Sequence, residues 1–161
     1  MIEPDLFSTI ELDTRDRSTG SPSALVGWLG LLLRAPSRVT IDVDENGDPT
    51  APVVIPVCGF HRLDVPSPPV DDPEMLVIRR KADNKEFRGP VVTTDPSSME
   101  PPPDEPPPSA ADLAGMTVDT YFNADLYALV ELPLQSGEYE VWFEFRGKRS
   151  NKESLELQLV P

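Results

Sequence analysis

Hydrophobic and polar residues alternate with a period of two along several stretches of this chain. The clearest stretch is 138–145, where the apolar positions are Tyr139, Val141, Phe143 and Phe145. Because successive side chains of a β-strand point to opposite faces of its sheet, such alternation is typical of a strand with one buried face. Trp142 interrupts the pattern, since it falls among the glutamates of the polar face.

The same alternation predicts strands at 38–43, 118–124 and 153–160. Weaker patterns predict four more, at 6–12, 53–58, 74–80 and 86–93. Pro56 would place the 53–58 strand at an edge or a bulge, because proline has no backbone N–H for the ladder. Seven or eight short strands separated by turn residues predict an all-β fold, an immunoglobulin-like antiparallel β-sandwich formed as one domain over 1–161.

One apolar segment, 21–35, does not alternate. Ser21 followed by Pro22 is typical of a helix start, so this segment predicts one short helix or, alternatively, a strand in the protein's own core. A segment that is apolar nearly all round has to be covered. If a partner covers it, Trp28, Leu29 and Leu32 are the candidate contact residues.

A second segment, 94–111, contains two runs of three prolines among acidic residues. Proline runs favour an extended backbone without internal hydrogen bonds. Proline-rich ligands of SH3 domains usually carry a basic anchor, whereas this segment is acidic. A long loop that acts as a spacer is the better interpretation.

Composition narrows the function classes. The chain has 161 residues, 39% of them hydrophobic, and includes 20 prolines and a formal net charge of -14. Such a charge repels phosphate backbones and anionic membranes, so we expect neither a nucleic acid nor a membrane as partner. The basic stretch 146–152 is interpreted as a solvated hairpin turn.

Cysteine content and apolar runs indicate the cellular compartment of the protein. Cys58 is the single cysteine, which excludes an internal disulfide and suits a reducing compartment. The first residues lack the pattern of a signal peptide. The apolar run 24–33 is far shorter than the roughly 20 residues that cross a bilayer. We therefore expect a cytoplasmic protein.

Catalytic chemistry finds little support in the sequence. His61, the single histidine, follows Cys58 by three residues, but no third group nearby would orient a nucleophile–base pair. A zinc site needs at least three protein ligands, and the chain has no further cysteine or histidine. Cys58 and His61 are expected to be ordinary packed or surface residues. The chain is not expected to be an enzyme.

Residues 42–48 resemble the first half of a calcium loop. Its candidate oxygen ligands are Asp42, Asp44, Asn46 and Asp48. The twelfth position of the loop is Val53, where calcium loops place a bidentate glutamate. The alternative is a hairpin turn, which the Asn46-Gly47 pair favours independently. Calcium is the one cofactor considered, and none is expected if the hairpin interpretation holds.

Trp142 has two interpretations. A tryptophan on a polar sheet face could anchor a protein interface. It could equally be covered by the proline-rich loop or by the apolar segment, in which case its role is structural.

The second half of the chain carries a series of short motifs within 86–160. They are 87–90 (Phe-Arg-Gly-Pro), 112–118, 122–126, 132–133, 137–141 (Gly-Glu-Tyr-Glu-Val) and 150–151 (Ser-Asn). Their order resembles the β-sandwich propeptide region of deuterolysin-type metalloendopeptidases and related immunoglobulin-like modules. The resemblance implies a sandwich fold and a module that covers a protease or another protein. It carries no catalytic residue over, because no zinc motif is present.

The function expected from these observations is non-catalytic protein binding, as an accessory β-sandwich module with a protein partner. The alternatives are a free-standing protease inhibitor or pro-domain-like module, and a calcium- or glycan-binding module. The sequence does not predict the oligomeric state.

Overall fold

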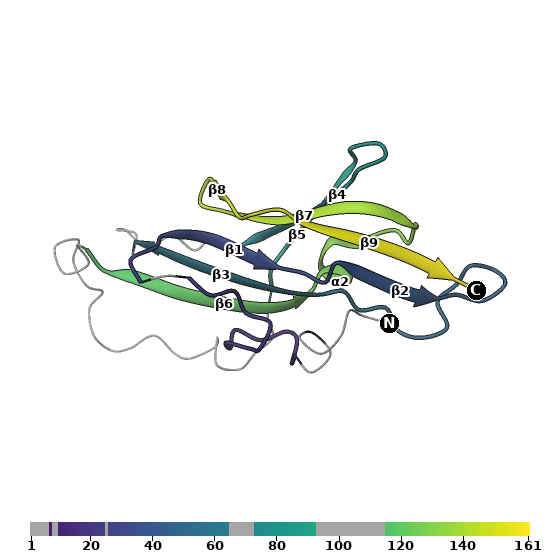
Figure 1. The fold of residues 1–161 in the computed structure, drawn as a ribbon, viewed down its shortest axis with the longest axis horizontal. Coiled ribbons are helices and arrows are strands. Elements are labelled where there is room, and N and C mark those ends of the chain that lie inside the picture. The colour runs from purple at the N-terminus through teal and green to yellow at the C-terminus, as the bar shows by residue number, and fades with distance from the viewer. Residues whose placement is uncertain (1–6, 8–9, 25, 65–72, 93–114) are drawn as a thin grey trace.

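Two β-sheets pack face to face in the computed structural model, which describes residues 7, 10–24, 26–64, 73–92 and 115–161 (Figure 1). The small sheet has the order β1 (Gly30–Arg34), β3 (Pro56–Asp64), β6 (Thr117–Asp125). The large sheet has the order β2 (Arg38–Asp42), β9 (Glu153–Val160), β7 (Gly137–Phe145), β4 (Met75–Arg80), β5 (Glu86–Pro90). The two-residue strand β8 (Lys148–Arg149) pairs with β7. The predicted all-β sandwich is confirmed.

The chain changes sheets between β1 and β2. β1 pairs with β3 in the small sheet, and four residues later β2 enters the large sheet beside β9. The backbone N–H of Glu156 donates to the carbonyl of Ser37 at 2.8 Å, which extends the new ladder. β2 and β9 run parallel, whereas the other named strand pairs are antiparallel. This order of strands in two sheets is that of an immunoglobulin-like sandwich.

A tyrosine fixes the start of β7. The fully buried Tyr139 donates its hydroxyl to the carbonyl of Gln135 at 2.7 Å. A tyrosine that binds the backbone a few residues upstream is a feature of immunoglobulin-like sandwiches, where a cysteine follows two residues later. Val141 stands at that position here and is fully buried.

The core lies between the inner faces of the two sheets. Phe122 of β6 meets Phe143 of β7 edge-on, with ring centroids 5.1 Å apart. Gly59 of β3 lies opposite Phe122, and a Cβ atom at Gly59 would fall 2.0 Å from its ring. The glycine therefore makes room for the Phe122 ring between the sheets.

Most predicted strands are found close to their predicted bounds. The range 153–160 is confirmed as β9, and 38–43, 74–80 and 86–93 contain β2, β4 and β5. The strands β6 and β7 include the predicted ranges 118–124 and 138–145 and extend slightly beyond them. The edge or bulge predicted from Pro56 is not found, since β3 is the middle strand of the small sheet. Pro56 is its first residue, where a missing N–H is tolerated, and the strand continues to Asp64. Residues 10–12 do not form a strand, and the rest of 6–12 except Phe7 lies outside the described residues.

Of the two alternatives predicted for 21–35, the strand is found, since Gly30–Arg34 forms β1, and the helix is wrong for the described residues. Leu31 and Leu33 enter the core, so tertiary contacts override the local helix signals. The described helix is α2 (Leu126–Val130), capped by the carboxylate of Asp125. The proline-rich range 94–111 lies outside the described residues, and no helix in the described part is long and apolar enough to cross a membrane.

Candidate partner-binding surfaces

Trp142 lies on the outer face of the large sheet, opposite Val77 of β4, yet only 1% of its surface is exposed. Three cations cover its ring. The guanidinium carbons of Arg79 and Arg149 lie 5.4 and 5.2 Å from the ring centroid, and the ammonium of Lys152 lies 4.9 Å away. These distances are typical of cation–π contacts. The described cover of Trp142 is thus a layer of charged side chains.

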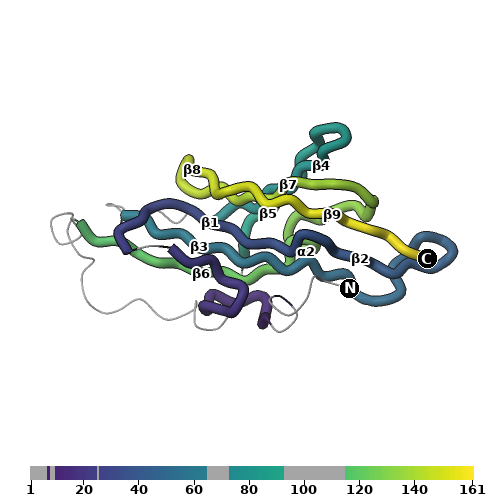
Figure 2. The backbone as a smooth tube through the Cα atoms, viewed as in Figure 1, coloured from purple at the N-terminus to yellow at the C-terminus, as the bar shows by residue number. Residues whose placement is uncertain are grey.

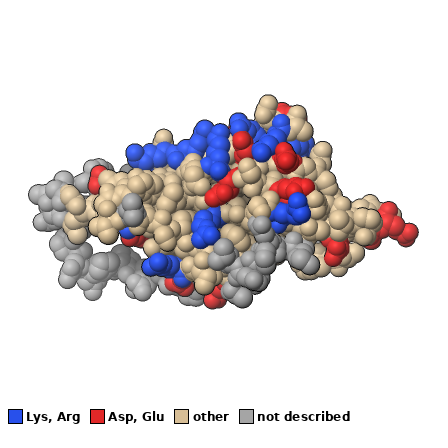
Figure 3. Space-filling view, viewed as in Figure 1, with Lys and Arg blue, Asp and Glu red and all other residues tan. Residues whose placement is uncertain are grey.

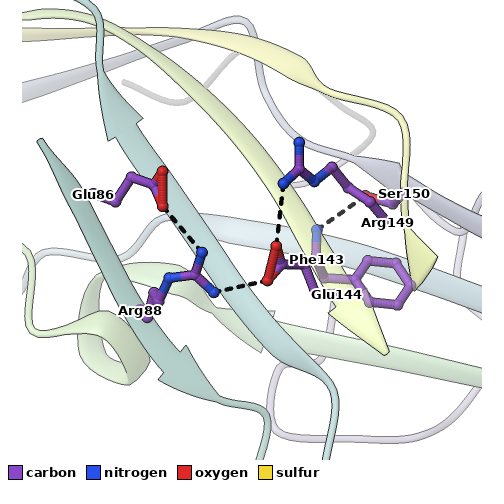
Figure 4. A network of polar contacts seen from close by, with 6 residues as sticks. All are labelled: Glu86, Arg88, Phe143, Glu144, Arg149 and Ser150. Atoms are coloured by element: carbon purple, nitrogen blue, oxygen red, sulfur yellow. Dashed lines mark hydrogen bonds and ion pairs between the residues drawn. The ribbon is translucent and has the colours of Figure 1, made fainter. Parts of the chain in front are cut away.

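Charged pairs extend this layer over β5, β4, β7 and β8, and Figure 4 shows those around Glu144. Arg88 donates to Glu144 at 2.7 Å and to Glu86 at 3.0 Å, and Arg149 lies 3.4 Å from the second oxygen of Glu144. Arg79 pairs with Glu140. The hydrogen bond from Arg88 is the main cause that lowers the pKa of Glu144 from its usual value, so this carboxylate stays ionised at neutral pH.

The other three sequence candidates lie on the small sheet. Trp28 stacks on Phe60 with centroids 6.5 Å apart, and Phe60 meets Tyr121 at 5.0 Å. Leu32 faces Phe60 across the β1–β3 pair and is half-buried. Leu29 is 47% exposed. A Cβ atom at position 30 would lie 3.0 Å from the Trp28 ring, so Gly30 allows the indole to fold back over the strand.

The structure therefore does not bring the four candidates together. Trp28 and Leu32 lie with Phe60 on the outer face of the small sheet, and Trp142 lies on the outer face of the large sheet. The core separates the two faces. They form two candidate surfaces, which we call the Trp142 surface (Arg79, Trp142, Arg149 and Lys152) and the Trp28 surface (Trp28, Leu29, Leu32, Phe60 and Tyr121).

Residues 42–48 form a hairpin tip after β2. Asp44 accepts backbone hydrogen bonds from Asn46 at 2.8 Å and from Asp48 at 3.0 Å, and Val43 forms a β-bridge with Pro49. Asp42 accepts a backbone hydrogen bond from Thr50 through its own carbonyl. In the described ranges, no three His, Cys, Asp or Glu side chains are grouped so that they could hold a metal ion. The turn accounts for the arrangement of these residues.

Cys58 and His61 both lie on β3 but not on the same face. His61 shares the inward face with Val57, whereas Cys58 lies with Phe60 on the outward face. Burial raises the pKa of the Cys58 thiol to about 11, against a weaker opposing hydrogen bond with Ser18. Cys58 is thus a packed, protonated thiol at neutral pH, and β3 does not bring it to His61 as a nucleophile–base pair.

Sequence reasoning missed the partner of His61. Glu74, which is 4% exposed, lies with one carboxylate oxygen 2.9 Å from His61 Nε2 and 2.7 Å from Arg15 Nη1. Burial alone would raise the pKa of Glu74, but the hydrogen bonds from His61 and Arg15 and the charge of Arg15 together lower it to about 2. The buried carboxylate is therefore ionised and ties the chain near residue 15 to β3.

A second polar contact holds the N-terminal segment (residues 10–24) against the small sheet (Figure 2). The buried Asn123 of β6 donates its amide to the hydroxyl of Thr14 at 3.0 Å and to the carbonyl of Asp16 at 2.6 Å. Its oxygen accepts from Ser18 at 2.9 Å. The sequence did not reveal the role of Asn123, because its partners lie more than a hundred residues away along the chain.

Comparisons of the chain with protein-family models, with curated proteins and with solved structures find no match. The resemblance of 86–160 to a deuterolysin propeptide therefore stays a prediction. The function has to be inferred from the surfaces of the molecule.

Proposed function

We propose that this chain is a non-catalytic protein-binding β-sandwich that contacts its partner through the Trp142 surface. The observation that carries the proposal is the ring of Trp142 under three cations on the solvent side of a sheet. Tryptophan and arginine dominate the binding energy of protein interfaces more than other residue types do. Here both types are concentrated at one place.

The cations over Trp142 have room for a partner. The side chain of Arg149 is 52% exposed and Lys152 is an exposed residue, so each presents one side to the indole and another to solvent. A partner carboxylate could pair with the outer side of these cations without displacing them from the ring. The Trp142 ring already keeps water from the inner side of Arg149 and Lys152. These cations are therefore partly desolvated before a partner arrives, which favours their pairing with a carboxylate.

The proposal also includes a non-catalytic role and a cytoplasmic location. The separation of Cys58 from His61 on β3 and the high pKa of the thiol support a non-catalytic role. A cytoplasmic, reducing setting agrees with Cys58 as the single cysteine, which is free and buried.

The test is capture of a partner by the immobilised full chain from a lysate of the cells that produce it. Lys152→Glu reverses one cation over Trp142 and should reduce the captured partner about tenfold, a loss of about 1.4 kcal/mol in binding. Lys85→Glu is the matched control, because Lys85 also lies over an aromatic ring, Phe87, at 5.4 Å. It should leave capture unchanged.

Two results would contradict the proposal. One is a wild-type chain that retains no protein above the bare matrix. The other is a partner that Lys152→Glu and Lys85→Glu retain as well as the wild type does, while circular dichroism shows both variants folded. In the second case the Trp28 surface becomes the next surface to test, with Leu29→Asp.

A further inference from the structure

Beside the Trp142 surface, an open groove of about 730 Å³ lies under the β7–β8 hairpin. Its lining consists of Pro73, Met75, Glu144, Phe145, Arg146, Gly147, Lys148 and Arg149. Three of these side chains are cations and one is an anion, in a chain whose formal net charge is -14. Lys and Arg side chains gather along the edge of the molecule that carries this hairpin and β4 (Figure 3).

The hairpin holds its cations in a defined position. Phe145 pairs with Lys148, so the turn consists of Arg146 and Gly147, which both have positive φ, at 49° and 74°. A two-residue turn of this kind matches the twist of the strands that it joins. At the base of the hairpin, the hydroxyl of Ser150 accepts the backbone N–H of Phe143 at 2.9 Å. The groove is thus bordered by a short, well-bonded hairpin.

The anion of the groove is already neutralised, whereas two of its cations are not. Glu144 is bound by Arg88 and Arg149. Neither Arg146 nor Lys148 forms an ion pair with any described residue. The guanidinium of Arg146 lies 4.7 Å from the centroid of the Phe145 ring, and its Nη1 donates to the carbonyl of Asp64 at 3.5 Å. Neither contact neutralises its charge.

The β4–β5 hairpin provides the contrast within the same molecule. Its tip also gathers cations, Arg80, Lys81 and Lys85. There Asp83 accepts from the Arg80 side chain at 3.1 Å and from the Lys85 backbone at 3.2 Å. Lys81 and Lys85 form no ion pair with a described residue either, so the groove differs from that tip in its hollow shape and in the half-buried Met75 of its lining.

We infer that the groove binds an acidic peptide segment of the protein partner, with carboxylates on Arg146 and Lys148 and an apolar side chain on Met75. The inference rests on the proposed function and names the chemistry of the partner. A nucleic acid also carries anions, but its phosphate backbone would extend beyond the groove over an acidic molecule and be repelled. A short peptide meets only the local positive charge, since charges more than about 8 Å away are screened at physiological salt.

The test uses the full chain and a capped peptide of sequence Glu-Glu-Leu-Glu-Glu, with Gln-Gln-Leu-Gln-Gln as the uncharged control. A Trp28→Phe background leaves Trp142 as the single indole. Arg149 both lies over Trp142 and lines the groove, so occupancy of the groove should change Trp142 fluorescence. We expect saturable binding of the acidic peptide that weakens as salt is raised, and none of the control peptide.

Variants locate the binding. The double variant Arg146→Gln/Lys148→Gln should raise the Kd of the acidic peptide at least tenfold, whereas Lys81→Gln/Lys85→Gln, at the other hairpin, should leave it unchanged. The inference is overturned if the wild type shows no saturable binding at low salt, or if the two double variants weaken binding equally. It is also overturned if a ten-nucleotide single-stranded DNA binds as tightly as the peptide.

The outcome is separable from that of the proposed function. If the partner is captured through the Trp142 surface but the peptide does not bind, the groove inference falls and the proposed function stands. If the peptide binds in the groove but the chain captures no protein, the acidic-ligand site stands and the proposed function falls.

Discussion

The two tryptophans of this chain lie on opposite outer faces of the sandwich and are surrounded differently. Trp28 belongs to an aromatic stack with Phe60 and Tyr121, beside a sheet that the N-terminal segment also contacts. Trp142 is the more buried of the two, yet its described ring contacts are with Arg79, Arg149 and Lys152. One face is covered by main chain and aromatic rings, and the other by side chains that also reach solvent.

This difference matters for function. A face covered by its own backbone has hydrogen bonds that must break before a partner can enter, such as those from Asn123 to the N-terminal segment. A face covered by cations needs no such opening, because a partner can add its carboxylates on top. For this reason the proposed function places the contact on the large sheet, although its tryptophan is the less exposed.

The largest expected change in stability comes from removing the tryptophan rings one at a time. Trp142→Ala should lower the free energy of unfolding by about 3–4 kcal/mol, since it removes a fully buried ring. Trp28→Ala should cost about 1–2 kcal/mol, because this ring is only half-buried and less area is returned to water. Urea unfolding of both variants measures the two values. Equal losses of unfolding free energy in the two variants would contradict the stated difference in burial between Trp142 and Trp28.

The second effect concerns the contact between the N-terminal segment and the sandwich. The pKa of Glu74 falls from 4.5 to about 2 on folding, which corresponds to about 3 kcal/mol of stability for the ionised form. Because the folded pKa is the lower one, this stability is present above about pH 4.5 and is lost as the pH falls toward 2. Glu74→Gln should therefore cost about 3 kcal/mol at pH 7 and clearly less at pH 3, measured by urea unfolding at both pH values.

The control for Glu74 is Glu138→Gln, which changes an exposed carboxylate on β7. It should change stability little at either pH. If Glu74→Gln costs the same at pH 3 as at pH 7, the contribution of the ionised carboxylate is not what ties this segment to β3.

The smallest effect tests the charged layer of the large sheet. A double-mutant cycle with Arg88→Gln and Glu144→Gln should give a coupling energy of about 0.5 kcal/mol, as for other exposed pairs. The coupling should disappear in 1 M NaCl, where the Debye length is about 3 Å. A coupling above 2 kcal/mol that survives salt would mean that this layer is rigid structure, and it would weaken the contrast with the small sheet.

Local pattern predicted those parts of the fold in which one face is polar. β9 alternates, and so does β7 except at Trp142, because their outer faces meet water or charged side chains. For β1 the sequence left a helix and a strand as alternatives, because both of its faces are apolar, with Leu31 and Leu33 in the core and Leu32 against Phe60. A strand covered on both sides loses its alternation, so periodicity cannot distinguish it from a buried helix.

The surfaces were predictable only in part. Trp142 stood out in the sequence because it broke a polar face, and the structure places it on that face. Its cover was not predictable, since Arg79 lies more than sixty residues away and reaches the ring only through the pairing of β4 with β7. The ionised Glu74 was missed for the same reason: its partners His61 and Arg15 come from separate parts of the chain.

The parallel pairing of β2 with β9 has a mechanical consequence. β2 follows the crossing from the small sheet, and β9 is the last strand of the chain, paired from Arg38–Glu156 to Asp42–Val160. A pulling force applied to the two ends of the chain would draw these neighbours in opposite directions along their length. Their backbone hydrogen bonds would then carry the load in shear, together, instead of opening one after another. Under such a pull, the β2–β9 pair would therefore separate only when several of these bonds break at once.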